Sequence, residues 1–247
     1  MARPAARICF VLGILALGSG MPSLRAAEPR PNLLLITIDT LRPDRLGCYG
    51  SPYLRTPTID KLAASGVVFN RAFAHTPLTL PSHANILLGT TPLMHGVHDN
   101  GIFMVPEDLP NLATLLKQNG YATGAFIGAF PLDSRFGLSR GFDVYDQSYG
   151  PGAGMMDINF VERKAEAVVG SALAWLDGRP GPWFAWIHCF DPHQPYAPPE
   201  PYLTRFKNDP YSGEVAYVDA ALAKLFGYLE DSRCRQESLP GTSTSKA

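Results

Sequence analysis

The sequence predicts an α/β domain built on a largely parallel sheet with helices on both faces. Three continuous apolar segments, at residues 32–39, 121–128 and 183–190, are typical of parallel strands that are buried on both faces. Segments with helical spacing separate them, which is the alternation that strand–helix–strand units produce. Ligand sites in such sheets lie beyond the carboxyl ends of the strands, so the polar residues after each apolar segment are the first candidates for function.

The composition excludes two classes of protein. Among 247 residues, 21 Lys and Arg stand against 22 Asp and Glu, so the formal net charge is −1 and there is no basic excess to attract nucleic acid. Hydrophobic residues make up 46% of the chain, which is too many for a disordered protein. The 23 Gly and 23 Pro predict a loop-rich domain of the kind that enzymes use.

The N-terminal segment, residues 1–27, is predicted to be a secretory signal peptide. Two arginines precede an apolar stretch at residues 8–17, which is about half as long as a membrane-spanning helix. The chain is therefore expected to be exported to the periplasm or the extracellular space. Leu24 or Arg25 occupies the place where a cleavage site prefers a small residue, so an uncleaved membrane anchor is the alternative.

The cysteines do not form a recognisable framework. Once Cys9 has left with the signal peptide, Cys48, Cys189 and Cys234 remain, an odd number with no close spacing. Neither a disulfide scaffold nor a zinc site is predicted. A Cys48–Cys189 disulfide is possible, and only the geometry of the two residues can decide whether it forms.

The folded domain is expected over residues 28–231, and its first part alternates strand and helix. After the strand at 32–39, residues 56–65 have helical spacing and stop at Gly66, a usual position for the end of a helix. Residues 67–74 return to strand character. The next predicted elements are a helix at 81–88, a helix at 109–119, a strand at 121–128, a helix at 159–177, a strand at 183–190 and a helix at 211–231.

The C-terminal segment, residues 232–247, contains very few apolar residues and is predicted to be a disordered tail. It begins where the alternation of strands and helices should deliver another strand. The architecture is therefore expected to be incomplete at the C-terminus.

Residues 79–83, Thr-Leu-Pro-Ser-His, are the first segment that could carry chemistry. Pro81 suits the first turn of a helix, which places Thr79 or Leu80 at the helix entry. Backbone N–H groups and the helix dipole there attract an anion and favour the ionised form of a hydroxyl. Thr79 could act as a nucleophile if a metal lowered its pKa. The alternative is that Thr79 caps the helix and His83 lies on its surface.

Asp39 ends the first predicted strand. A carboxylate in that position could hold a hard divalent cation such as Ca²⁺, Mg²⁺ or Mn²⁺. It could equally cap the following turn, and Arg42 and Asp44 could form a surface pair of little energetic value.

A third cluster follows the most apolar strand. His188, Asp191 and His193 lie close together there, in a loop stiffened by prolines. Imidazoles in this position could bind an oxyanion or protonate a leaving group, whereas a structural role for one of them is the alternative. His95, beside a predicted turn, is expected to pack or to hydrogen-bond locally.

Together these segments resemble the sulfatase family of the alkaline-phosphatase superfamily, over roughly residues 30–230. The resemblance implies the corresponding α/β fold and the hydrolysis of sulfuric esters, or of related phosphate or phosphonate esters, on a small molecule or a glycan. The motifs that carry it follow Asp39 in order: residues 56–63 (TPTIDKLA), 66–69 (GVVF), 79–83 (TLPSH), 89–92 (GTTP), 95–96 (HG), 119–123 (NGYAT), 140–143 (RGFD) and 188–196 (HCFDPHQPY).

The resemblance also implies roles for single residues around one divalent cation. Asp39 matches a metal-ligand aspartate. Thr79 falls at the position of the nucleophile, which also contacts the metal. His83 matches the basic residue that steadies the nucleophile, and His193 matches a histidine that contacts the transferred group. His188 and Asp191, in the same loop, are the expected substrate-binding residues.

Three positions depart from the family pattern. Thr79 stands where the family has a Cys or Ser that is oxidised to formylglycine, and a threonine cannot give that aldehyde. An ordinary ester on Thr79 would need a second attack by water, so phosphoryl or phosphonyl transfer competes with sulfuryl transfer. Thr40 replaces the second of two adjacent aspartates, and residues 128–131 lack the family's Lys and His.

The segment after residue 231 contains no Asp-His-Gly or Asp-Asn-Gly strand, which in the family supplies further metal ligands. We therefore expect a truncated or frame-shifted copy that is inactive, or nearly so, alone. The alternative is a non-catalytic binding or scaffold domain on a degenerate sulfatase fold.

Overall fold

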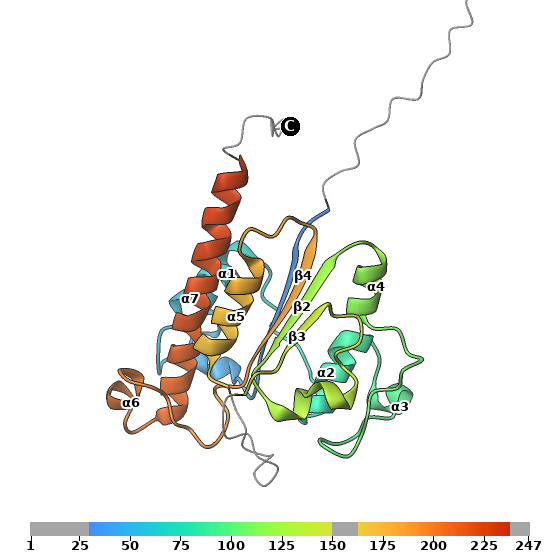
Figure 1. The fold of residues 1–247 in the computed structure, drawn as a ribbon. Helices are drawn as coiled ribbons and strands as arrows, with labels where there is room; N and C mark the ends of the chain where they lie inside the picture. Colours follow the sequence, from blue (N-terminus) through green and yellow to red (C-terminus); the bar gives the residue numbers. More distant parts are fainter. Residues whose placement is uncertain (1–29, 150–162, 238–247) are drawn as a thin grey trace, which may run out of the picture.

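A computed structural model of the chain describes residues 30–149 and 163–237, with side chains as far as Ser232. The predicted signal peptide, the first residues of the predicted helix at 159–177 and the end of the predicted tail lie outside these ranges. The described residues form a four-stranded sheet in the order β1-β4-β2-β3, with every pair parallel (Figure 1). The predicted α/β class with a parallel sheet is confirmed.

Three strands lie where the sequence predicts them, namely β1 (Leu33–Ile38), β2 (Ala122–Ile127) and β4 (Trp183–Cys189). A fourth strand, β3 (Val144–Asp146), pairs with β2 at one edge of the sheet. Strand β3 was not predicted, because it is only 3 residues long and is not fully buried.

Five helices occupy predicted places: α1 (Pro57–Ser65), α2 (Thr79–Leu88), α4 (Leu112–Gln118), α5 (Ala165–Leu176) and α7 (Pro210–Glu237). Two short helices, α3 (Pro92–His95) and α6 (Tyr202–Arg205), were not predicted. Helix α7 continues to Glu237, into the segment predicted to be disordered, because a helix satisfies its own backbone hydrogen bonds without a core. None of the helices in the described ranges is long and apolar enough to cross a bilayer.

The helices cover both faces of the sheet, as expected. On one face α5 and α7 pack together against the strands, with α1 beside α7, whereas α2 and α4 lie on the opposite face (Figure 1). Side chains of β4 alternate between the two cores: Ala185 and Ile187 join the core under α5 and α7, and Phe184 and Trp186 join the core under α2. The same alternation directs His188 towards α2.

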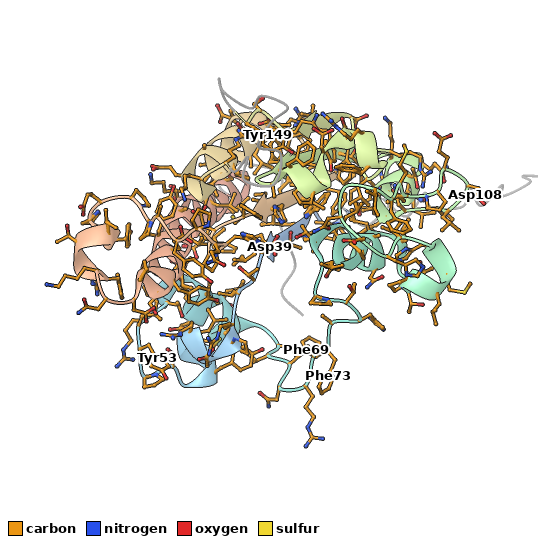
Figure 2. The ribbon with its side chains drawn as sticks, turned by 90° about the horizontal axis from the view of Figure 1, so that it is seen from below. Asp39, Tyr53, Phe69, Phe73, Asp108 and Tyr149 are labelled. Atoms are coloured by element: carbon orange, nitrogen blue, oxygen red, sulfur yellow. The ribbon has the colours of Figure 1, made fainter. Side chains whose placement is uncertain are left out.

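The prediction of a strand at residues 67–74 is wrong. This segment has no sheet partner in the described part of the chain, and it is exposed along its whole length. Val67, Phe69 and Phe73 are 81%, 69% and 85% exposed, and Figure 2 shows both phenylalanines at the periphery. An apolar run becomes a strand only where a neighbouring strand pairs with its backbone, and here none does.

The two cysteines whose side chains are described, Cys48 and Cys189, both carry free thiols. The Cys48–Cys189 bridge that the sequence left open is not formed. Burial raises the pKa of the Cys189 thiol to about 12, so this cysteine is a packing residue rather than a reactive one.

Candidate active site

The carboxyl ends of the parallel strands meet at one edge of the sheet. Figure 2 views the molecule from this side, with Asp39 near the centre. Asp39 directly follows β1, and its backbone N–H donates to the carbonyl of Cys189 at the end of β4, with 2.9 Å between N and O. Two of the three segments that the sequence singled out are thereby joined by a backbone hydrogen bond.

The pairing of β1 with β4 places polar side chains on one face. Thr37 pairs in register with His188, and its Oγ1 accepts a hydrogen bond of 3.0 Å from Nε1 of Trp186. Residues two apart on a strand share a face, so Asp39 follows Thr37 on the side of the sheet that α2 covers. His188 Nε2 lies 3.7 Å from Asp39 Oδ2 as a result.

Helix α2 brings the predicted nucleophile to this edge. Thr79 is the first residue of the helix, and its Oγ1 donates to Oδ2 of Asp39 across 3.1 Å. The cap position belongs to Leu78, so the alternative in which Thr79 caps the helix does not hold. Asn100, which the sequence did not mark, accepts the N–H of Leu80 at 2.8 Å and satisfies one of the free backbone donors at the helix start.

His83 is buried beside this pair rather than at the surface of the helix. Its Nδ1 lies 2.7 Å from the carbonyl oxygen of Thr79, and because a carbonyl only accepts, Nδ1 carries the proton. Burial, followed by the nearby charge of His188, lowers the pKa of His83 to about 3. His83 is therefore neutral at neutral pH, and its Nε2 is a buried acceptor that lacks a partner among the described residues.

Asp39 is ionised in this environment. Burial alone would raise the pKa of its carboxyl, but the adjacent imidazole of His188, together with the charges of His83 and His193, outweighs burial and leaves the pKa below its ordinary value. Both ring nitrogens of the fully buried His188 lack hydrogen-bond partners within the described residues. Such orphaned polar atoms at the edge of a sheet are typical of a site that receives a ligand.

The predicted site residues in the loop after β4 have two different roles. His193 stacks on Phe190 with ring centroids 4.1 Å apart, and it lies near enough to Asp39 to contribute to its lowered pKa. Asp191 instead accepts the N–H of Ala165 at 2.8 Å and the ammonium of Lys164 at 3.0 Å. Its carboxylate thus holds the start of α5 and is not directed at Thr79.

The backbone conformation of Thr40 is a feature of this edge that the sequence did not reveal. Its φ of +50° lies in the left-handed region, which a β-branched residue rarely adopts. Its hydroxyl donates to the carbonyl of Pro192, and its own carbonyl accepts from the hydroxyl of Tyr211 at 2.8 Å. These bonds tie the residue after Asp39 to the loop that carries His193. Strain of this kind concentrates at functional sites.

His95, as predicted, takes part in local contacts. It is buried, its Nδ1 accepts the N–H of Val97 at 3.1 Å, and its Nε2 lies 2.7 Å from the side-chain amide of Asn85. These contacts fix the turn after α3 and place no reactive atom near Thr79.

The described oxygen donors at this edge are fewer than a divalent cation requires. Asp39 and Thr79 offer oxygens of the kind that Ca²⁺ or Mg²⁺ prefers, but such ions take about six or more ligands. In the part of the chain that the structure describes, no group of three or more His, Cys, Asp or Glu side chains could hold a metal. These residues alone do not complete a cation site.

Comparisons with known proteins find sulfatases among the similar chains. The chain is 38% identical to human steryl-sulfatase over 116 residues, which cover 43% of this chain and 20% of that protein. It is 24% identical to N-acetylgalactosamine-6-sulfatase of Canis lupus familiaris over 96% of this chain and 54% of that one. The crystal structure of Ps i-CgsB in complex with k-i-k-neocarrahexaose superposes with a TM-score of 0.68 at 26% identity, covering 83% of this chain and 56% of that chain.

The chain thus spans about half the length, or less, of the proteins that it matches. The family model described as Sulfatase matches residues 31–239, a range that holds β1, α2, β4 and every side chain of the site. Through this match the chain belongs to the sulfatase family.

Proposed function

We propose that this chain carries the nucleophile of an ester hydrolase for sulfate or phosphate-type esters, and that Thr79 is that nucleophile. The observation that carries the proposal is the 3.1 Å hydrogen bond from Thr79 Oγ1 to Asp39 Oδ2. Because the hydroxyl donates to the carboxylate, its lone pairs are left for attack on sulfur or phosphorus. The first turn of α2 favours the negative charge that develops there.

The proposed reaction has two steps. In the first, Thr79 Oγ1 bonds to sulfur or phosphorus and its proton passes to Asp39. The bond to the leaving oxygen breaks, and this oxygen departs with the bonding electron pair and takes up the proton from Asp39. In the second, water attacks the resulting ester on Thr79, which releases sulfate or phosphate and restores the hydroxyl. Asp39 is a weak base because its pKa is lowered, so we expect slow turnover from the described residues alone.

The histidines take different parts in this proposal. His83 positions the nucleophile through the carbonyl of Thr79. His188 and His193, beside Asp39, are the proposed contacts for the oxygens of the transferred group. Asp191 is left out because both of its oxygens are engaged at the start of α5.

A divalent cation at Asp39 and Thr79 belongs to the proposal as an additional requirement, with further ligands from outside the described residues. The names of similar proteins support glycan or steroid sulfate esters as the substrate class, since they include a steryl-sulfatase and an N-acetylgalactosamine-6-sulfatase. Export to the periplasm or extracellular space remains a prediction from residues 1–27.

The test compares Thr79→Ala and Thr79→Ser with the unaltered chain. Aryl sulfate and aryl phosphate turnover would be measured with Ca²⁺, Mg²⁺ or Mn²⁺ added, and the substrate that is hydrolysed identifies the transferred group. Thr79→Ala should lower turnover by about 10²-fold or more, whereas Thr79→Ser keeps the hydroxyl and should retain activity. Equal turnover in Thr79→Ala and the unaltered chain would contradict the nucleophile assignment.

A second candidate, a non-catalytic binding or scaffold domain, is favoured by the incomplete set of cation ligands. Elemental analysis of the purified chain separates the two functions. One tightly held divalent ion per chain, together with turnover that depends on Thr79, supports the hydrolase. No bound ion and no turnover of either ester supports the binding domain.

A further inference from the structure

An open pocket of about 610 Å³ lies apart from Thr79 and Asp39, a volume within the ~300–1,000 Å³ range of ligand pockets. Tyr53 and Arg55 line one side, and Arg205 and Phe206, at the end of α6, line another. Figure 2 shows Tyr53 on the same side of the molecule as Asp39. A ligand could therefore reach both places from one side.

Two arginines that line the pocket have no ion-pair partner among the described residues. Arg55 and Arg205 are exposed, and neither forms an ion pair with a carboxylate in the described ranges. The nearest acids have other partners. Asp209 pairs with Arg45 at 2.7 Å and Asp44 pairs with Arg42 at 2.9 Å. Asp60 lies near Arg55 but accepts the N–H of Cys48 at 2.7 Å and forms no ion pair with either arginine among the described residues. Two guanidinium groups are thus left to bind an anion, which they can do bidentately.

The aromatic wall of the pocket is held in place before any ligand arrives. The guanidinium of Arg45 lies over the ring of Tyr53 at 3.9 Å, and it is fixed by Asp209 and by Oγ of Ser212 at 2.8 Å. Gly50, which also lines the pocket, has a φ of +83°, a left-handed conformation that lets the backbone turn there. A fixed ring beside two cationic groups suits a sugar that bears an anionic substituent.

A short series of contacts joins this pocket to the candidate active site. The hydroxyl of Tyr211 donates to the carbonyl of Thr40, the residue after Asp39. The guanidinium of Arg45 lies 5.8 Å from the centre of the Tyr211 ring and 3.9 Å from that of Tyr53. The pocket is therefore a neighbour of the Asp39 edge and not an unrelated feature of the surface.

We propose that Arg55 and Arg205 form a second anion site, which holds a sulfate or carboxylate group of an oligosaccharide whose scissile ester lies at Thr79. This inference rests on the proposed function and narrows its substrate class to polyanionic glycans. The second site would increase the affinity for an oligosaccharide that bears several anionic groups. It would not change the affinity for an aryl ester, which has only one.

The experiment measures binding, so that it does not depend on turnover. A sulfated carrageenan hexasaccharide would be titrated calorimetrically into the Thr79→Ala variant, which cannot hydrolyse it by the proposed reaction. The same titration would be made with a triple variant that carries Thr79→Ala, Arg55→Gln and Arg205→Gln. A matched control carries Lys117→Gln and Lys224→Gln, which remove two exposed positive charges on α4 and α7. The desulfated hexasaccharide tests the need for the anion.

Loss of both arginines should weaken binding about tenfold or more, while the control stays within about twofold. The desulfated sugar should bind no better to the chain with Arg55 and Arg205 than to the chain without them. Equal weakening in the control, unchanged binding after loss of the arginines, or no binding at all would overturn the proposal. If the proposed hydrolase function is wrong, Thr79→Ala will leave turnover unchanged. The binding measurement does not depend on that result.

Discussion

The imidazole rings of His83 and His188 meet edge to face, with their centroids 4.8 Å apart. Both rings are buried, and a single carboxylate, Asp39, lies beside them. Burial, which disfavours a charged ring, and secondly the neighbouring imidazole of His188 lower the pKa of His83 to about 3. His83 is therefore neutral at neutral pH.

This pairing predicts a loss of stability in acid. In the unfolded chain His83 binds a proton below about pH 6.5, whereas in the fold it does so only near pH 3. The free energy of unfolding should therefore decrease as the pH falls through this window, by up to about 1.4 kcal/mol per pH unit from this residue. Urea titrations with a chelator present, at several pH values between 7 and 4, measure it.

His83→Gln should reduce that slope, since its amide can donate to the carbonyl of Thr79 without taking up a proton. His75→Gln is the control, because His75 is exposed. A slope that both variants leave unchanged would show that His83 is not the group that titrates.

Most of the fold could be predicted because its signals are local. Continuous apolar strands such as β4 and helices ended by a glycine, such as α2 at Gly89, are determined by burial and backbone conformation within a few residues. The segment at 67–74 has the same composition as a strand, but strand formation depends on a partner elsewhere in the chain. That information is not contained in the segment itself.

Glu214 provides a prediction about stability at neutral pH. It is fully buried on α7, where Oε1 accepts the N–H of Ala197 at 2.9 Å and lies 3.4 Å from Lys164 Nζ, while Oε2 has no partner among the described residues. Burial raises the pKa of its carboxyl to about 7, although Ala197 and Lys164 act in the opposite direction. An acid with a raised pKa in the fold destabilises the protein as the pH rises from about 4.5 to 7.

Glu214→Gln should consequently raise the free energy of unfolding at pH 8, by about 1 kcal/mol or more, because the amide keeps the bond to Ala197 without a buried charge. At pH 4.5 the two proteins should be nearly equal. Glu230→Gln, which breaks only an exposed pair with Lys61, serves as the control. A variant that is less stable than the parent at pH 8 would show that the pair with Lys164 outweighs the burial of the charge.

The exposed segment at 67–74 predicts concentration-dependent self-association. Phe69 and Phe73 present large apolar side chains to solvent. Phe69→Ser with Phe73→Ser should lower the associated fraction in light scattering at high protein concentration. Leu93→Ser with Met94→Ser is the matched control, since Leu93 and Met94 are 91% and 74% exposed on α3. If both pairs of substitutions act equally, exposure in general, and not this segment, causes association.

The candidate site was only partly visible in the sequence. Asp39, Thr79 and His193 could be marked because each follows a strand or begins a helix at the edge where parallel sheets bind ligands. The task of Asp191 could not be deduced, since its partner Ala165 lies 26 positions away. The neutral state of His83 also depends on long-range packing, because it follows from burial against Trp186 and His188.

The conformation of Thr40 leads to the last prediction, which concerns the incomplete cation site. Aspartate tolerates the left-handed region better than a β-branched residue does, so Thr40→Asp should be accepted at φ +50°. It would place a second carboxylate next to Asp39, where this chain has one, and hard cations bind more tightly as the number of anionic oxygens increases. We expect Thr40→Asp to bind Ca²⁺ or Mn²⁺ about tenfold or more tightly than the parent chain in calorimetric titrations.

Two further variants are the controls for this prediction. Adding Asp39→Asn should remove the gain in affinity, whereas Thr40→Asn tests the backbone effect without the charge. If Thr40→Asn gains as much as Thr40→Asp, relief of strain and not an added ligand is responsible.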